Sequence, residues 1–163
     1  MTSAFVLGAL LATQPASPTI VDRIEQFCVA TEMQRDAFDR IASEQGLERM
    51  VRVVRSMDDV DQSKWETMFG DRTAQFQLSG TVAGGTEGDY CAVMVATPSD
   101  DWRAAVESLA MSLNMQPVDV GQSSANQVRE SRTWTTIGAP SMSLVYKLYG
   151  SSLVVSLERP ATD

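Results

Sequence analysis

Hydrophobic side chains near the start of the chain recur at the spacing of an amphipathic helix, whereas the middle of the chain alternates like a strand. The stripe of the predicted helix over residues 20–31 consists of Ile20, Ile24, Phe27, Cys28 and Thr31. Residues 31–34 have the spacing of a capping box, which predicts a second helix that ends near Gly46. The pattern over residues 48–70 fits a strand and a helix equally well, so we predict no element there.

Strict alternation of apolar and polar residues predicts a strand over residues 72–83. An apolar run that places Cys91, Val93 and Val95 on one face predicts a second strand over residues 90–96. Helix-start signals at residues 97–100 and an apolar stripe that includes Trp102 predict a helix that stops before Pro117. Three further strands are expected at 128–137, 143–149 and 152–159. The sequence therefore predicts an α+β fold: an antiparallel sheet of about five strands, with N-terminal helices and one inserted helix packed on one face.

Size and charge narrow the class of protein. The chain has 163 residues, which suits one domain, and we expect that domain to span residues 17–163. Lys and Arg number 13 against 21 Asp and Glu, a net charge of -8 that repels phosphate backbones, so no nucleic-acid partner is expected. The chain contains no histidine, which excludes sites that need imidazole as a base or as a metal ligand.

The first residues resemble an export signal. An uncharged apolar run over residues 4–12 is followed by small and helix-breaking residues, so residues 1–16 are predicted to be a signal peptide. The run is too short to span a bilayer, so no integral membrane segment is expected in the mature chain. Because no basic residue precedes Arg23, a strand or helix docked on the domain is the alternative.

Both cysteines lie on predicted inward faces, Cys28 on the first helix and Cys91 on a strand. In an oxidising compartment the simplest interpretation is a Cys28–Cys91 disulfide that joins the helix to the sheet. Two unpaired core cysteines, or a reactive thiol, are the alternatives.

Few residues suggest a binding or catalytic site. Trp134 shares a predicted strand face with Glu130 and Arg132, which makes Trp134, Arg132 and Tyr146 a candidate contact surface. The alternative places Trp134 inward, with the charges near the strand ends. No catalytic constellation, metal site or cofactor motif is recognised, so none is predicted.

The layout resembles that of small uncharacterised bacterial exported (periplasmic) proteins with one helix cysteine and one strand cysteine. The residues that carry this resemblance are 27–31 around Cys28, the helix end at 42–47, and Cys91. The resemblance implies export and a disulfide, and it transfers no activity.

These observations lead to three functional hypotheses. The first is a non-catalytic soluble envelope protein, periplasmic or secreted, that binds a protein partner or a small apolar ligand. The second is an immunity or inhibitor protein directed against a basic toxin or enzyme. The third is an enzyme that works with carboxylates, or with an acid and Lys64 or Lys147, converging in a pocket.

Overall fold

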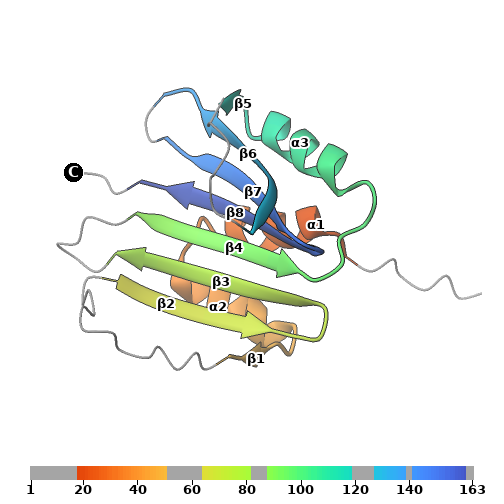
Figure 1. Ribbon diagram of the computed structural model, residues 1–163. Coiled ribbons are helices and arrows are strands. Elements are labelled where there is room, and N and C mark those ends of the chain that lie inside the picture. The colour runs from red at the N-terminus through yellow and green to blue at the C-terminus, as the bar shows by residue number, and fades with distance from the viewer. Residues whose placement is uncertain (1–17, 51–63, 82–87, 119–126, 139–140, 161–163) are drawn as a thin grey trace, which may run out of the picture.

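The computed structural model describes residues 18–50, 64–81, 88–118, 127–138 and 141–160. The predicted signal peptide therefore lies outside the described residues. Within the described parts, helices precede each of two runs of four strands (Figure 1). In chain order the elements are α1 (Ile20–Ile24), the π-helical turn η1 (Glu25–Val29), α2 (Arg35–Glu44), β1 (Glu48–Arg49), β2 (Lys64–Gly70), β3 (Ala74–Thr81), β4 (Asp89–Val95), α3 (Trp102–Ser112), β5 (Met115–Val118), β6 (Val128–Thr136), β7 (Ser143–Tyr149) and β8 (Ser152–Arg159).

The strands of the described residues form one antiparallel sheet of eight, in the order β1-β2-β3-β4-β8-β7-β6-β5. The predicted sheet of about five strands is therefore wrong. β1 and β2 lie in the ambiguous 48–70 segment, where β2 pairs with β3 along seven residues. β5 was missed because it contains Pro117, which is tolerated there because β5 is an edge strand and pairs only with β6.

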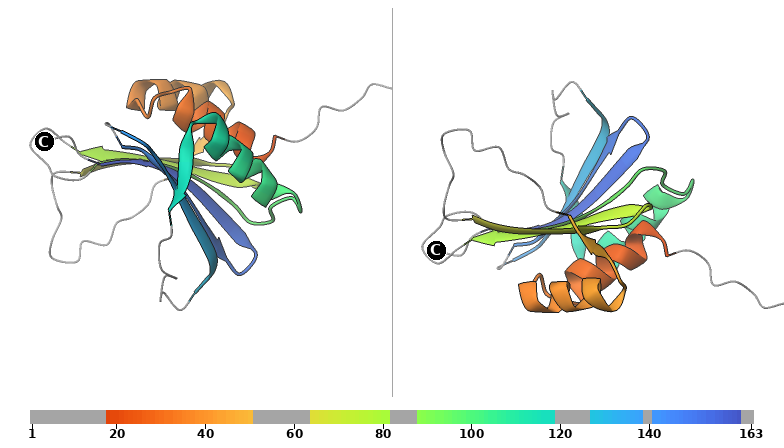
Figure 2. Two further views of the ribbon diagram at one scale, coloured as in Figure 1. Left: turned by 90° about the horizontal axis from the view of Figure 1, so that it is seen from above. Right: turned by 90° about the horizontal axis from the view of Figure 1, so that it is seen from below.

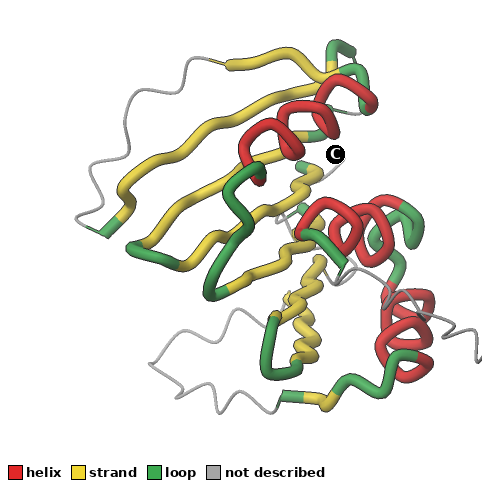
Figure 3. The backbone as a smooth tube through the Cα atoms, turned by 90° about the vertical axis from the view of Figure 1, so that its right-hand side faces the viewer, coloured by secondary structure: helices red, strands yellow, loops and turns green. Residues whose placement is uncertain are grey.

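The sheet consists of two four-strand meanders that meet where β4 pairs with β8. Each meander follows a helix in the chain, α2 before β1 and α3 before β5, so the topology of the first half is repeated in the second. The sheet is strongly twisted, and the strands of one half are seen lengthwise while those of the other are seen nearly end-on (Figure 3). No internal repeat is recognisable in the sequence, so this repeat is visible only in the topology.

The helices of the described chain lie on one face of the sheet (Figure 2). The register places Cys91, Val93, Val155 and Tyr146 on this face. Here α1 and η1 contribute Ile24, Phe27 and Cys28 to the core, all with no exposed surface. The predicted helical stripe is therefore buried. The main core lies between this helical layer and the centre of the sheet.

Two helix starts differ from the sequence prediction. α3 begins at Trp102, later than the start signals at residues 97–100 predict, and it has no side-chain cap. A capping box forms between Thr19 and Asp22 at the start of α1. The box predicted at residues 31–34 does not form, because the buried Thr31 hydroxyl donates to the Phe27 carbonyl at 2.6 Å and Gln34 precedes α2 without a side-chain cap. At the other end of α2, Gly46 has a φ of +65° and terminates the helix as predicted.

Candidate functional site

Three aromatic side chains form a continuous buried layer between α3 and the second half of the sheet. Trp102 lies at the start of α3, Trp134 on β6 and Tyr146 on β7. The Trp102 and Tyr146 rings meet edge to face with centroids 4.8 Å apart, and the Trp134 and Tyr146 centroids are 5.8 Å apart. All three residues are at most 5% exposed. Aromatic contacts of this kind hold the ring positions, so groups that rest on the layer have a rigid base.

Four charged residues cover this aromatic layer, and we call them the α3-β6 surface. Arg103 and Glu107 lie one turn apart on α3, while Glu130 and Arg132 lie two residues apart on β6. Arg103 pairs with Glu130 at 2.6 Å, and Glu107 pairs with Arg132 at 3.2 Å. The two ion pairs therefore place positive and negative charge alternately along the helix and along the strand.

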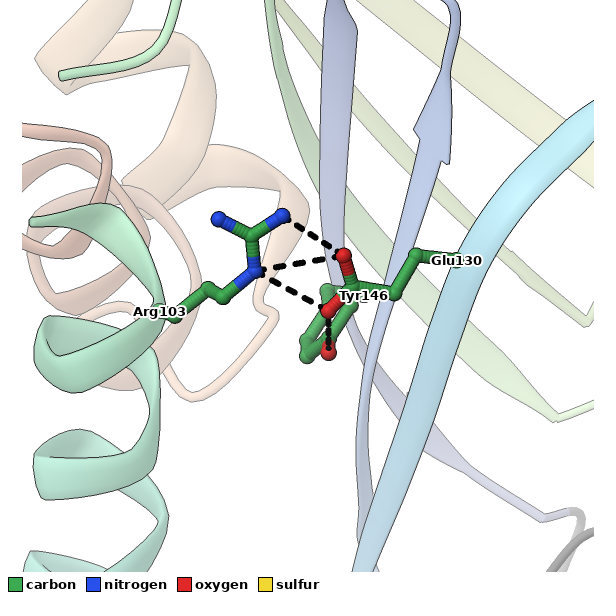
Figure 4. A network of polar contacts seen from close by, with 3 residues as sticks. All are labelled: Arg103, Glu130 and Tyr146. Carbon is green, nitrogen blue, oxygen red and sulfur yellow. Dashed lines mark hydrogen bonds and ion pairs between the residues drawn. The ribbon is translucent and has the colours of Figure 1, made fainter. Parts of the chain in front are cut away.

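The Arg103–Glu130 pair is a bidentate contact that also includes Tyr146 (Figure 4). The Arg103 Nε atom donates to Oε1 of Glu130 at 3.0 Å and more weakly to Oε2 at 3.2 Å, and Nη2 donates to Oε2 at 2.6 Å. The Tyr146 hydroxyl donates to Oε1 of the same carboxylate at 2.6 Å. Charge-assisted bonds of this length are the stronger kind of protein hydrogen bond, so Glu130 is held from two sides.

The ionisation of this network follows from these contacts. Hydrogen bonds from Arg103 and Tyr146 lower the pKa of Glu130, because both stabilise its carboxylate form. Burial, and then the hydrogen bond to Glu130, raise the pKa of Tyr146 to about 12. Glu130 is therefore ionised and Tyr146 neutral at physiological pH. A carboxylate fixed in this way is poorly suited to transfer protons.

The exposed arginines are also stacked on the aromatic layer. The guanidinium carbon of Arg103 lies 4.4 Å from the ring centroid of Trp102, and that of Arg132 lies 5.1 Å from the centroid of Trp134. Their side chains remain 53% and 45% exposed, respectively. Each guanidinium is therefore positioned by an indole beneath it and by a glutamate beside it, while part of it faces solvent.

The predicted contact residues come together, although not in the expected way. Trp134 takes the inward orientation that the sequence left open, and Tyr146 is buried beside it, so only Arg132 presents exposed surface. Sequence reasoning missed the role of Arg103 and Glu107. Their four-residue spacing on a predicted helix was a usable signal, but nothing in the sequence indicated that α3 packs beside β6.

The two cysteines form a disulfide between η1 and β4, with Cα atoms 5.6 Å apart and no exposed surface on either residue. This agrees with the expected pairing and leaves no free thiol. The bond fits an oxidising compartment.

The described part of the chain contains no group of three or more His, Cys, Asp or Glu residues that could hold a metal ion. Of the lysines considered as catalytic partners, Lys147 is half-buried on β7, and the side chain of Lys64 lies outside the described residues. The Asp100–Asp101 pair is exposed at the start of α3, and Asp101 makes no capping hydrogen bond with its side chain. No helix within the described ranges is long and apolar enough to cross a membrane.

Comparisons with known proteins assign no family to this arrangement. No protein-family model, curated protein or solved structure matches the chain.

Proposed function

We propose that this chain is a non-catalytic envelope protein, periplasmic or secreted, that binds a protein partner through the α3-β6 surface. The observation that carries the proposal is the arrangement of Arg103 and Arg132, each stacked on a buried indole and paired with a glutamate while about half exposed. Arginine and tryptophan are the residue types most often found at the energetic centres of protein interfaces.

Preorganisation is the physical reason why this surface suits recognition. Ordering a long arginine side chain at an interface normally costs about 0.5–1.5 kcal/mol. Here the indole and the glutamate already hold each guanidinium, so much of that ordering has taken place before a partner arrives. The alternating charges also favour one docking register, because a shift of one position would bring like charges together.

Two observations support the proposed compartment. The Cys28–Cys91 disulfide suits an oxidising environment, and the apolar run at residues 4–12 resembles an export signal. A net charge of -8 disfavours nucleic acid as the partner.

Site-specific photo-crosslinking tests where the partner binds. A photoreactive residue is placed at Ala104, an exposed α3 position beside Arg103 that takes no part in either ion pair. Its matched control is Ala30, an exposed alanine just after η1. After irradiation of the cells that produce the protein, the Ala104 probe should give a discrete adduct of defined mass that the Ala30 probe lacks.

Two results would contradict the proposal. Absence of any adduct at Ala104, with the protein present at its normal level, would show that nothing binds beside this surface. Identical adducts from both positions would show that the contact is non-specific.

A further inference from the structure

A cavity of about 680 Å³ lies at the start of α1 and is lined by none of the four residues of the α3-β6 surface. Its walls come from three segments: the beginning of α1, the β2-β3 turn at residues 71–73, and residues 95–99 at the end of β4 and just after it. Ile20, Val95 and Pro98 make part of the wall apolar, while Arg23 and Thr73 supply polar atoms. A volume of this size is typical of sites that hold small molecules.

Arg23 is the unusual residue of this cavity. Its Nη2 atom donates to the Thr73 hydroxyl at 3.0 Å. Its Nε and Nη1 atoms are buried and have no hydrogen-bond partner within the described structure. The guanidinium carbon lies 5.7 Å from the ring centroid of Phe76, so an aromatic face supplies part of its surroundings in place of an acceptor.

The nearby acid does not satisfy these nitrogens. Burial alone would raise the pKa of Asp71, but its hydrogen bonds from Thr73 and Ala74, and then the charge of Arg23, lower it. However, its Oδ1 atom accepts from the Thr73 amide, the Thr73 hydroxyl and the Ala74 amide at 2.6–2.8 Å. This oxygen is therefore occupied in shaping the β2-β3 turn.

Leaving a buried hydrogen-bond donor without an acceptor costs free energy, so such a donor in a native protein indicates that a partner is missing. A guanidinium fork matches the two oxygens of a carboxylate. Arg23 and Arg72 supply two positive charges on the cavity wall, against the one negative charge of Asp71, in a chain of net charge -8. The apolar part of the wall suits a ligand that carries a hydrocarbon group next to its charge.

We propose that this cavity binds a small carboxylate with an apolar substituent. The carboxylate pairs with Arg23, and the substituent packs against Ile20, Val95 and Pro98. To reach the ligand, the guanidinium turns toward the cavity, at the cost of its hydrogen bond to Thr73 and its contact with Phe76. Nε and Nη1 then gain the acceptors that they lack.

Amide chemical shifts of the full, disulfide-bonded protein provide the test, with hexanoate as the probe. Hexanamide has the same shape without the charge, and inorganic phosphate has charge without the hydrocarbon. Hexanoate should shift the amides at residues 19–23, 71–73 and 95–97 with a Kd of the order of 1 mM, as expected for a fragment. Hexanamide and phosphate should each bind at least about tenfold more weakly.

The variant Arg23→Met removes the charge and keeps most of the side-chain length, and it should weaken hexanoate binding about tenfold or more. Arg40→Met on the exposed face of α2 is the matched control, since it makes the same change in net charge. If Arg23→Met does not fold, Ala96→Phe replaces it, because Ala96 is exposed and a larger side chain there fills the cavity.

Four outcomes would overturn the proposal. Equal binding of hexanoate and hexanamide would show that the charge of Arg23 is not used. Phosphate binding as tight as hexanoate binding would show that the hydrocarbon group does not contribute to affinity. Absence of shifts at these amides, or unchanged binding after the cavity is filled, would show that the cavity is not the site. None of these results depends on whether the α3-β6 surface binds a partner.

Discussion

The Tyr146 hydroxyl offers the most direct perturbation of the α3-β6 surface. Tyr146→Phe keeps the ring contacts with Trp102 and Trp134 and removes only the 2.6 Å hydrogen bond to Glu130. Hydrogen bonds to charged groups contribute about 1.5–3 kcal/mol. The Glu130 side chain is 35% exposed and keeps Arg103 as a donor, so water replaces part of the lost bond. We expect a loss of about 1 kcal/mol at neutral pH, equivalent to roughly 2–4 °C in Tm.

The same substitution has a characteristic pH dependence. The pKa of Tyr146 is raised from 10.0 to about 12 in the folded protein. A group whose pKa is higher in the folded state stabilises the fold below its unfolded pKa, and this contribution is lost as pH rises through the folded value. The wild type should therefore lose stability between about pH 10 and 12. The loss should stay below about 2.7 kcal/mol, the upper limit set by a two-unit shift.

Urea unfolding at pH 7 and at several values above pH 10 measures both effects, and an absorbance titration of tyrosinate identifies the group. In Tyr146→Phe the component that titrates near pH 12 should be missing, and stability should fall less steeply above pH 10. The reasoning is refuted if all tyrosines of the wild type titrate together near pH 10. It is equally refuted if the variant and the wild type lose stability in parallel.

Three other predictions concern the disulfide, Glu130 and Gly88. Replacing Cys28 and Cys91 together by Ala should lower the unfolding free energy by about 4 kcal/mol, the loop-closure value for a sequence separation of 63. Urea unfolding measures this loss, and an unchanged unfolding free energy would contradict the prediction. The ionised Glu130 stabilises the fold, so the wild type should lose this contribution as pH falls through the lowered pKa of Glu130. Glu130→Gln has no such contribution to lose, so acid-unfolding curves that run parallel for the two proteins would contradict the assignment. Gly88→Ala should destabilise the β4-β8 pairing by more than about 1 kcal/mol, because the added Cβ would lie 1.8 Å from the Arg159 carbonyl oxygen. Hydrogen exchange of the β4 amides measures this effect, and unchanged exchange rates would contradict the prediction.

Much of the fold could be predicted because its hydrophobic periodicity is local. The buried stripe of α1 and η1 and the alternation of β3 follow from spacing alone. The last three strands also lie close to their predicted bounds. β2 was missed because the pattern of its segment fits a strand and a helix equally well, and β5 was missed because it contains Pro117. The capping box at Thr31 failed because burial gave its hydroxyl a different partner, the carbonyl of Phe27.

The candidate site was predictable only in part, because it is made by contacts between distant segments. Trp134, Arg132 and Tyr146 could be singled out as unusual residues on strands. Whether Trp134 points inward depends on α3, which covers that half of the sheet and supplies Trp102 and Arg103. Pairings between residues 25–27 positions apart, such as Arg103 with Glu130, have no local sequence signal.

A charge swap tests the proposed contact surface most directly. The double variant Glu107→Arg, Arg132→Glu keeps both ion pairs of opposite charge but turns the alternating pattern into a basic row on α3 and an acidic row on β6. Its unfolding free energy should stay within about 1 kcal/mol of the wild type. The measurement is the yield of the crosslinked adduct formed from Ala104. We predict that the swap reduces this yield about tenfold or more; an unchanged yield would contradict recognition through the α3-β6 surface.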